Sequence, residues 1–314
     1  MGHLTLLTAG SGGLRFLAGL IDVRPEDEVH VVANVGNDCE VWGLYCCPDI
    51  DLVLHGMAGQ VDPYRRDRPN GASFECFETI RKLGMPSWLR ICDRDLATHL
   101  VRSDILRSGA NLEDATSRLA ERFGLGVRLM PPTNDPVRTT VQTAEGVLGG
   151  LEYAARGRSA PEAASIRYEG AGEARALPRV LDSILEADRV ILAPADPVLG
   201  IGPILALQDV RKALARTRAG VVAISPFVGS QPARGKDGLA PHTSDAAFPV
   251  RFAERLLGLV DSLVVHTSDL PLLEAIRAAG IDAWTDNILM NSREDARRLA
   301  GRVAFPERAV ARKR

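Results

Sequence analysis

The sequence has no uncharged apolar run of the ~18 residues that a membrane-spanning helix needs. Its first ten residues lack the basic segment of a signal peptide. Leu6 stands where N-myristoylation requires Ser or Thr. These absences favour a soluble protein with no membrane partner.

Cysteine is scarce and irregularly spaced. The five cysteines lie in the first third of the chain, without a C-x-x-C pair and without clustered histidines that would indicate zinc. We interpret them as reduced thiols and expect a cytoplasmic protein. They are Cys39, Cys46, Cys47, Cys76 and Cys92.

An excess of charge of either sign is also missing. Thirty-eight Lys and Arg nearly balance 40 Asp and Glu, so the net charge is −2. The basic surplus of a nucleic-acid-binding protein is absent, and we expect small-molecule partners. The sequence also lacks the G-x-S-x-G motif of serine hydrolases and the H-E-x-x-H motif of zinc proteases.

What the sequence does contain is an alternation of short apolar runs and helical stretches. Hydrophobic residues make up 46% and charged residues 25% of 314 residues, which is typical of a globular protein. Runs at 4–8, 29–33, 127–130, 189–193, 221–225, 262–266 and 283–285 predict strands. Helical segments separate them, among them 14–21, three helices between 73 and 123 of which Asn111 caps the last, and 204–215. We predict an α/β fold with an open, mostly parallel Rossmann-like sheet and helices on both faces.

The alternation of predicted strands and helices is interrupted once. Residues 133–178 contain strand candidates at 137–143 and 166–168 within a segment rich in Gly, Ala, Arg and Glu. We predict a small inserted subdomain there, and a Rossmann-like core formed by residues 1–132 and 179–314.

Ligands of open α/β sheets bind beyond the carboxyl ends of the strands, so the loops there are the candidate sites. The first loop follows residues 4–8, and its glycines and helix-start N–H groups favour a phosphate, although a tight turn without a ligand is the alternative. It is neither a Walker A motif nor G-x-G-x-x-G, because Arg15 occupies the third glycine position. Its candidate residues are Gly10, Ser11, Gly12, Gly13 and Arg15.

Polar residues also follow the second strand. Asn34, Asn37 and Asp38 surround a glycine there, and the alternative is a simple turn. Asp49 and Asp51 come shortly after, two positions apart, and are expected to bind one Mg²⁺, although Asp49 as a helix cap is the alternative.

Two further regions complete the candidates. A block at 93–99 predicts a helix that Asp93 caps, with capping and a surface salt bridge as the alternative to ligand binding. Two Gly- and Pro-rich loops follow the strands at 189–193 and 221–225 and suit a nucleotide, or are ordinary connections. The candidate residues are Asp93, Arg94, Asp95, Thr98, His99, Pro194, Asp196, Gly202, Ser225 and Gly229.

The combination resembles the 2-phospho-L-lactate transferase family of coenzyme F420 biosynthesis over nearly the whole chain. The matching segments are Ala-Gly-Ser-Gly-Gly-Leu-Arg-Phe-Leu at 9–17, Asn-Val-Gly-Asn-Asp at 34–38, Cys-Pro-Asp-Ile-Asp at 47–51, Asp-Arg-Asp-Leu-Ala-Thr-His-Leu at 93–100, Asp-Pro-Val-Arg-Thr at 135–139 and Ile-Gly-Pro-Ile-Leu at 201–205.

The resemblance implies an enzyme that takes a phosphorylated three-carbon acid from a guanylylated diphosphate donor. It joins the acid to the terminal ribityl hydroxyl of the deazaflavin Fo with Mg²⁺ and releases GMP. The expected partners are Fo, the donor and GMP or GDP, and the expected assembly is a homodimer. Asp38 and Asp49 are the candidate catalytic residues, each as base or as metal ligand.

Two departures from the family pattern stand out. Asn37 occupies a position where relatives usually carry Asp, and Ala195-Asp196 replaces Ser-Asn. Two other functions compete with the transferase: a nicotinamide oxidoreductase of the same fold, which the missing third glycine disfavours, and a non-catalytic nucleotide-sugar-binding regulator, which is not expected to carry the 93–99 block.

Overall fold

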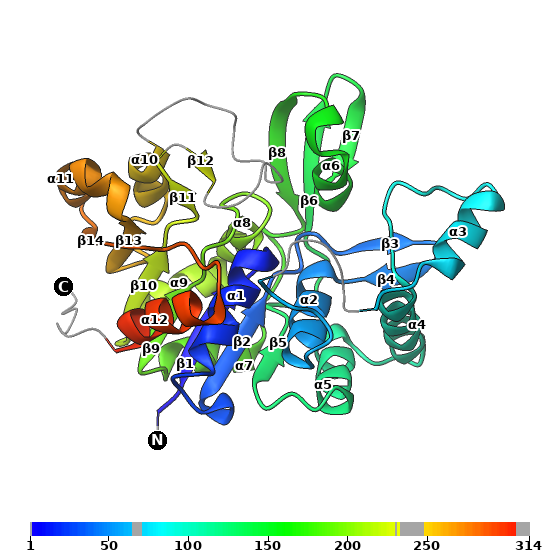
Figure 1. Ribbon diagram of the computed structural model, residues 1–314, viewed down its shortest axis with the longest axis horizontal. Helices are drawn as coiled ribbons and strands as arrows, with labels where there is room; N and C mark the ends of the chain where they lie inside the picture. The colour runs from blue at the N-terminus through cyan, green and yellow to red at the C-terminus, as the bar shows by residue number, and fades with distance from the viewer. Residues whose placement is uncertain (1, 65–70, 230, 233–247, 306–314) are drawn as a thin grey trace.

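The computed structural model describes residues 2–64, 71–229, 231–232 and 248–305. A seven-stranded parallel sheet lies at the centre, in the order β14-β13-β10-β9-β1-β2-β5 (Figure 1). The predicted Rossmann-like class is confirmed, and each predicted strand of the core is present. The strands are β1 (Leu4–Thr8), β2 (Val29–Ala33), β5 (Arg128–Met130), β9 (Arg189–Leu192), β10 (Gly220–Ile224), β13 (Ser262–His266) and β14 (Asp282–Asp286).

The strand order reverses direction next to β1. From β1 the chain passes to β2 and β5 on one side, and from β9 it passes to β10, β13 and β14 on the other. Right-handed crossovers that progress in opposite directions place their helices on opposite faces. The crevice beyond the carboxyl ends of β1 and β9 is therefore the expected ligand position.

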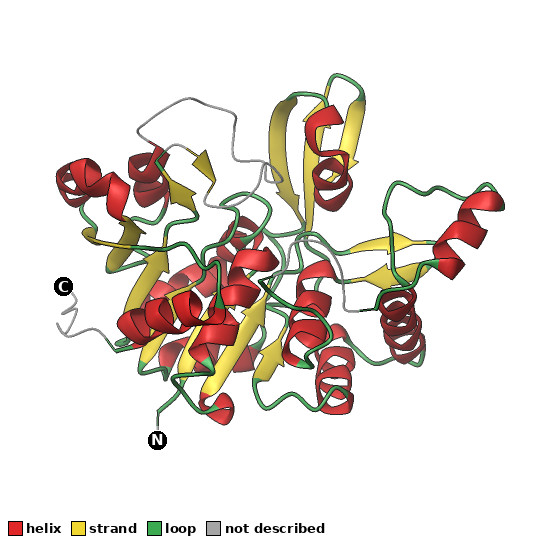
Figure 2. Ribbon diagram, viewed as in Figure 1, coloured by secondary structure: helices red, strands yellow, loops and turns green. Residues whose placement is uncertain are grey.

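Helices cover both faces of this sheet (Figures 1 and 2). α1 packs against α12 and α2, and α7 packs against α9. Gly19 permits the contact of α1 with α12, because a Cβ there would lie 2.3 Å from the backbone carbon of Ala296. The helices of the core are α1 (Gly10–Leu20), α2 (Pro48–Met57), α7 (Pro178–Leu185), α8 (Ile201–Ala206), α9 (Gln208–Arg216), α10 (Phe248–Arg255), α11 (Leu273–Ala278) and α12 (Arg293–Ala304).

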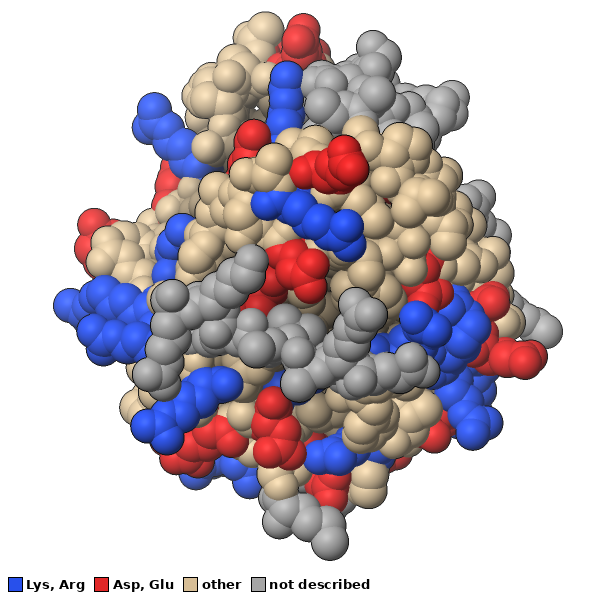
Figure 3. Space-filling model, turned by 90° about the vertical axis from the view of Figure 1, so that its left-hand side faces the viewer, with Lys and Arg blue, Asp and Glu red and all other residues tan. Residues whose placement is uncertain are grey.

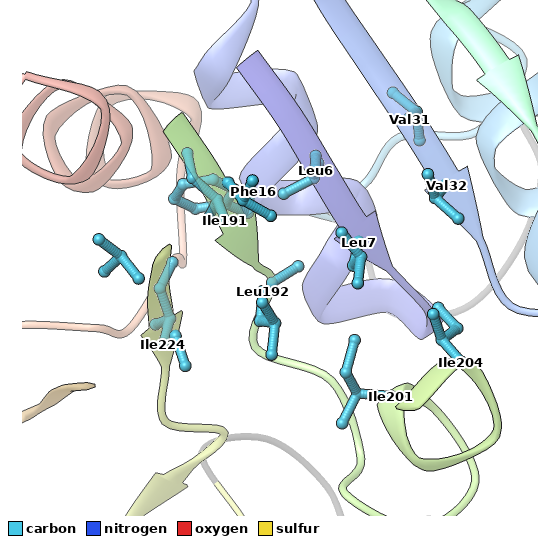
Figure 4. Close-up of a cluster of buried hydrophobic side chains, with 14 of the residues drawn as sticks. Leu6, Leu7, Phe16, Val31, Val32, Ile191, Leu192, Ile201, Ile204 and Ile224 are labelled. Carbon is cyan, nitrogen blue, oxygen red and sulfur yellow. The ribbon is translucent and has the colours of Figure 1, made fainter. Parts of the chain in front are cut away.

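The core of the molecule lies between the central strands and these helices (Figure 4). Leu6 and Leu7 of β1, Phe16 of α1 and Ile191 of β9 are fully buried. Strands β1 and β2 are buried along their whole length, as a parallel sheet covered on both faces requires. This burial fixes the ends of β1, β2 and β9, from which the candidate loops extend.

A second, antiparallel sheet lies within the segment predicted as an insertion. Its order is β7-β6-β8, and with α6 it projects from the core (Figure 1). The two strands expected in this segment are present, whereas the domain boundaries themselves stay a prediction. The elements are β6 (Arg138–Thr143), β7 (Gly146–Gly149), α6 (Gly150–Arg156), η2 (Gly157–Ser159) and β8 (Ala163–Glu169).

A hairpin and the helices α3 and α4 form a further projection (Figure 1), whereas α5 packs against β5 of the central sheet. The hairpin was not predicted from the sequence. The hairpin turns at Trp42 and Gly43, whose φ angles of 53° and 73° fit a two-residue turn of the I′ type. The strands are short, which is why their alternation was missed. The elements are β3 (Cys39–Val41), β4 (Leu44–Cys46), α3 (Glu75–Lys82), α4 (Asp93–Arg107) and α5 (Leu112–Arg122).

Several predicted helix boundaries were wrong. α1 begins at Gly10 rather than Leu14, so the predicted glycine turn is the first turn of the helix. Cys92, and not Asp93, is the N-cap of α4, and its sulfur accepts from the Asp95 N–H. Asn111 caps α5 as predicted. The stretch at 204–215 is two helices that meet at Leu207, where the backbone is extended.

The remaining short elements are η1 (Glu26–Glu28), β11 (Phe227–Val228), β12 (Gln231–Pro232) and η3 (Thr267–Leu272). Among the described residues, no helix combines the length and the apolar character that a bilayer crossing demands. On the face shown in Figure 3, basic and acidic side chains are interspersed, as the near-zero net charge predicts.

Candidate active site

The Asp49 carboxylate joins three loops at the carboxyl edge of the sheet. Its Oδ1 accepts from the Gly10 N–H at 2.7 Å, and its Oδ2 accepts from the side-chain amides of Asn34 at 2.8 Å and Asn37 at 3.1 Å. Asp49 lies in the first turn of α2 and is buried. The residues predicted separately after β1, after β2 and on α2 therefore meet at one point.

The loop after β9 joins the same cluster. The amides of Asn34 and Asn37 both donate to the Leu199 carbonyl oxygen at 2.9 Å. Asp196 supports this loop, because its Oδ1 accepts from the Val198 and Leu199 N–H groups at 2.8 Å. The hydrogen bonds thus span the crevice between the ends of β1 and β9.

Asp38 is the neighbour of this cluster and differs from it in its hydrogen bonding. Its side chain is 2% exposed, and among the described residues neither carboxylate oxygen accepts from an N–H or a hydroxyl group, although the Cys47 thiol is a neighbour that acts to lower its pKa. Burial raises the pKa of Asp38 well above its usual range, although the charge of Arg138 opposes the shift. Burial also raises the pKa of Asp49, and the Gly10 N–H and the asparagine amides oppose that shift. An unpartnered buried carboxylate is costly and is typical of a functional position.

These residues fit a hard divalent cation. Mg²⁺ prefers carboxylate and amide oxygens, and the unpartnered atoms here are both oxygens of Asp38 and the Oδ1 of Asn37. The two Asp49 oxygens already accept three N–H bonds, which fixes their orientation. We therefore regard Asp38, Asp49 and Asn37 as the residues that would hold Mg²⁺.

Asp51 lies apart from this set, contrary to the expectation that it shares one cation with Asp49. Residues two apart on a helix do not face each other, and α2 already begins at Pro48. Asp51 forms an ion pair with the fully buried Arg102, and His99 Nε2 lies 3.1 Å from its Oδ2. Burial acts to raise the pKa of Asp51, but Arg102 and His99 outweigh it and bring the pKa to about 2.

Cys46 joins Asp51 and His99 in a buried group whose possible ligand atoms lie within 4.8 Å of one another. The guanidinium of Arg102 already neutralises the Asp51 carboxylate, so a metal ion here would face a neighbouring positive charge. This arrangement indicates a structural contact between α2 and α4.

The residues of the 93–99 block make several different contacts within the protein. Asp93 accepts from the N–H groups of Glu75 and Cys76 and so caps α3. Asp95 Oδ1 lies 3.4 Å from His55 Nε2, and the Thr98 hydroxyl lies 3.2 Å from the same nitrogen. Arg94 is exposed at the start of α4. A ligand-binding role for these residues stays a prediction.

The glycines after β1 have a packing function that the sequence did not show. A Cβ on Gly12 would lie 2.2 Å from the Pro194 carbonyl oxygen, and one on Gly13 would lie 2.0 Å from Thr8 Oγ1. Arg15 is buried, and its Nε donates to the Pro63 carbonyl oxygen at 2.6 Å. Gly10 and Ser11 are exposed and remain the positions of this loop open to a ligand.

Three other predicted nucleotide contacts, Gly202, Ser225 and Gly229, lie against other parts of the chain. A Cβ on Gly202 would lie 2.1 Å from the Tyr168 hydroxyl. Ser225 Oγ accepts from the Phe227 N–H, and the Gly229 N–H donates to Asp269 Oδ1 at 2.8 Å. These contacts connect loops to one another, and a nucleotide contact at these positions stays a prediction.

The structure adds Tyr45, Arg138 and Thr139 to the site. Arg138 and Thr139 begin β6, and the Thr139 N–H donates to the Gly36 carbonyl oxygen at 2.7 Å, which attaches the small sheet to the loop that carries Asp38. Arg138 and Thr139 belong to one of the segments that carried the family resemblance, so a signal existed. They were missed because the insertion was treated as separate from the core.

Comparison with known proteins gives the family. A sequence profile described as 2-phospho-L-lactate transferase CofD matches residues 4–295. The chain is 32% identical over 298 residues to a 2-phospho-L-lactate transferase of Methanosarcina mazei, covering 95% of this chain and 98% of that protein. It is 35% identical over 309 residues to a phosphoenolpyruvate transferase of Kitasatospora aureofaciens, covering 95% of each.

A solved structure of a UPF0052 family protein from Bacillus halodurans has the same fold. The TM-score is 0.66 with 13% identity, over 97% of this chain and 99% of that one. This likeness supports the Rossmann-like architecture alone. The sequence matches are closer and span nearly the whole chain, and from them we conclude that the protein is an enzyme of the 2-phospho-L-lactate transferase family.

Proposed function

We propose that this enzyme transfers a phosphorylated three-carbon acid from a guanylyl diphosphate donor to the terminal ribityl hydroxyl of Fo, in the biosynthesis of coenzyme F420. The observation that carries the proposal is the buried, unpartnered carboxylate of Asp38 beside the Asp49 cluster. It lies at the crevice where a Rossmann-like sheet binds its ligand, in a chain of this transferase family.

In this reaction the ribityl hydroxyl oxygen attacks the phosphorus that bears the three-carbon acid. A new P–O bond forms, the P–O bond to GMP breaks and GMP leaves. The hydroxyl proton passes to a base, for which Asp38 and Asp49 are the candidates. The chain contributes mainly alignment and charge stabilisation, as is usual for transfer at phosphorus.

Mg²⁺, when bound, would neutralise charge on the diphosphate. Asp49 is oriented for this by the Gly10 N–H and two side-chain amides, whereas the Asp38 oxygens accept no N–H bond from the described residues. Each amide that holds Asp49 also holds the Leu199 carbonyl. The loops around the crevice are thereby fixed before substrate binds, which lowers the cost of alignment.

The transferred acid is 2-phospholactate, phosphoenolpyruvate or a closely related acid. Relatives named for each of the first two are similarly close to this chain, at 32% and 35% identity. The test is incubation with Fo, Mg²⁺ and synthetic guanylylated donors of both acids, followed by mass spectrometry. We expect the Fo-phosphoacid adduct and GMP in equal amounts from at least one donor.

The matched control is Asp38→Asn, which keeps the size of the side chain and removes its charge. It should yield far less adduct from the same donor. Absence of adduct and of GMP from both donors with the wild-type enzyme would refute the proposed reaction.

A further inference from the structure

Arg138 occupies an unusual position at the start of β6. Its guanidinium is half-buried, and its hydrogen bonds go to the Val137 carbonyl oxygen at 2.8 Å and the Tyr45 hydroxyl at 2.7 Å. Both are neutral oxygens. In the part of the chain that the structure describes, Arg138 belongs to no ion pair, since no carboxylate oxygen lies within 4.0 Å of its nitrogens.

Tyr45 contacts this guanidinium through both its hydroxyl and its ring. The phenol accepts one hydrogen bond, and its ring centroid lies 5.4 Å from the guanidinium carbon. Burial, together with the negative charge of Asp38, raises the pKa of the Tyr45 phenol, so the phenol stays neutral. The contact therefore fixes the direction of Arg138 without neutralising its charge.

Several polar atoms near the start of β6 have no hydrogen-bond partner among the described residues. The charge of Arg138 acts on Asp38, whose two buried oxygens have no N–H or hydroxyl partner in the described part of the chain; the Cys47 thiol is a neighbour. Asn37 Oδ1 and Thr139 Oγ1 are also buried without partners. Both residues adjoin Gly150. A Cβ on Gly150 would lie 3.0 Å from Asn37 Oδ1 and 2.9 Å from the Thr139 Cβ. Of these atoms, the Asp38 oxygens are the ones on which the charge of Arg138 acts, whereas Thr139 lies next to Arg138 in β6 and therefore points to the opposite face of the strand. Buried polar atoms without partners close to a cation are typical of a site that a polar ligand completes.

We propose that Arg138 binds an oxyanion of the phosphorylated donor, with Tyr45 as the residue that positions it. A guanidinium fork matches phosphate and carboxylate oxygens bidentately. Asp38 and Asp49 alone would repel such a donor, and Arg138 supplies the opposing charge from the chain itself. The inference rests on the proposed function and adds a binding residue that belongs to the inserted sheet.

The test measures binding rather than turnover. The probes are phosphoenolpyruvate, inorganic pyrophosphate and GDP in calorimetry with Mg²⁺ present, and Fo by fluorescence. The variants are Arg138→Gln, Arg138→Lys and Tyr45→Phe. Arg167→Gln is the matched control, because Arg167 is exposed on the adjacent strand β8.

We expect Arg138→Gln to weaken binding of at least one anionic probe by about 10- to 100-fold, the range for lost hydrogen bonds to a charged group. Arg138→Lys should lie between Gln and wild type, and Tyr45→Phe should weaken the same probe by a smaller factor. Fo binding and the control should not change. Loss confined to phosphoenolpyruvate assigns Arg138 to the transferred acid, and loss confined to pyrophosphate and GDP assigns it to the diphosphate.

Unchanged affinity for all three anions in Arg138→Gln, or equal loss in Arg167→Gln, would overturn the inference. If Arg138→Gln melts early, affinity in the charge-conserving Lys variant decides, because a fork-dependent site must weaken there too. The proposed function is judged separately by adduct formation. A protein that binds anions through Arg138 but makes no adduct would refute the reaction and leave the binding residue in place.

Discussion

At the scale of single residues, the site depends on how each carboxylate is partnered. Asp49 accepts three N–H bonds, and Asp51 is neutralised by Arg102. Asp38 accepts from no N–H or hydroxyl group among the residues that the structure describes. Three acidic residues within 14 positions of one another thus have three different roles. The difference arises from what each one faces, since residue type alone does not distinguish them.

Asp38→Asn and Asp49→Asn should each lower kcat/KM by about 10²-fold or more, equivalent to ~2.7 kcal/mol of transition-state stabilisation. Asp49→Asn also places an amide against donors that need an acceptor, so it should lose stability whereas Asp38→Asn should not. Steady-state kinetics and thermal melting check both expectations. Wild-type kcat/KM in both variants would show that other residues carry out the reaction.

Asn37 behaves as a donor in this structure, which changes the expectation for restoring the family's usual acid. In Asn37→Asp the new carboxylate would face Asp49 Oδ2 and the Leu199 carbonyl oxygen, which Asn37 now contacts at 3.1 and 2.9 Å. Like charges at that distance repel. We expect a lower melting temperature in EDTA that Mg²⁺ restores.

The control for this variant is Asn287→Asp, which lies on an exposed loop and keeps the oxygen that accepts from Leu289 N–H. It should show no Mg²⁺-dependent melting. A melting temperature of Asn37→Asp that ignores Mg²⁺ would show that no cation binds beside Asp49.

At the scale of elements, two contacts hold the site loops in place. One is the start of α1 against the loop after β9, where Gly12 meets Pro194. The other is α2 against α4 through Asp51, His99 and Arg102. Both bring together segments that are far apart in the sequence, and neither leaves a pattern that periodicity analysis detects.

Gly12→Ala should lower the melting temperature, because its Cβ would lie 2.2 Å from the Pro194 carbonyl oxygen, a backbone atom that cannot move cheaply. Gly149→Ala is the control, since Gly149 has a negative φ of −66° and open space around it. Differential scanning calorimetry compares the two. Equal melting temperatures would show that the loop after β9 can shift at little cost in stability. The phosphate-binding role would then be the remaining explanation for Gly12.

Arg102→Met should cost about 3–5 kcal/mol of unfolding free energy, because it leaves the Asp51 charge buried without its partner. The double variant with Asp51→Asn should recover part of that loss. Urea unfolding measures both, with the exposed Arg118→Met on α5 as control. If Arg102→Met were as stable as Arg118→Met, water would be solvating the Asp51 carboxylate in place of the guanidinium.

At the scale of the whole molecule, stability should depend on pH through a pair of stacked histidines at the amino ends of β1 and β2. The rings of His3 and His30 lie 3.9 Å apart. Burial, with the charges of His3 and Arg128, lowers the pKa of His30 to about 4. The unfolded chain takes up a proton near pH 6.5, but the folded chain does so only near pH 4.

Stability should therefore fall as the pH drops from about 6.5 to about 4. His30→Gln should flatten this part of the profile, whereas His266→Gln, at the opposite end of the sheet, should not. Urea midpoints at pH 7 and pH 4.5 provide the measurement. An unchanged pH slope in His30→Gln would assign the dependence to other groups.

The sequence by itself determined the sheet and the family. Short β-branched apolar runs such as 29–33 and 262–266 favour strands buried on both faces, and loops at the carboxyl ends of parallel strands meet at one edge. Asn34, Asn37 and Asp38 were candidates because they follow such a strand directly, and Asp49 was a candidate because it is two residues from a second carboxylate.

Only the tertiary structure decided which of these residues act together. Helical geometry turned Asp51 away from Asp49 and toward Arg102, 51 positions later. Packing of the small sheet brought Arg138 to Asp38 across 100 positions of sequence. Such contacts depend on the relative placement of packed elements. That placement is set by side-chain volumes and by long-range hydrogen bonds such as the Thr139 N–H to Gly36 carbonyl bond, which a linear pattern does not encode.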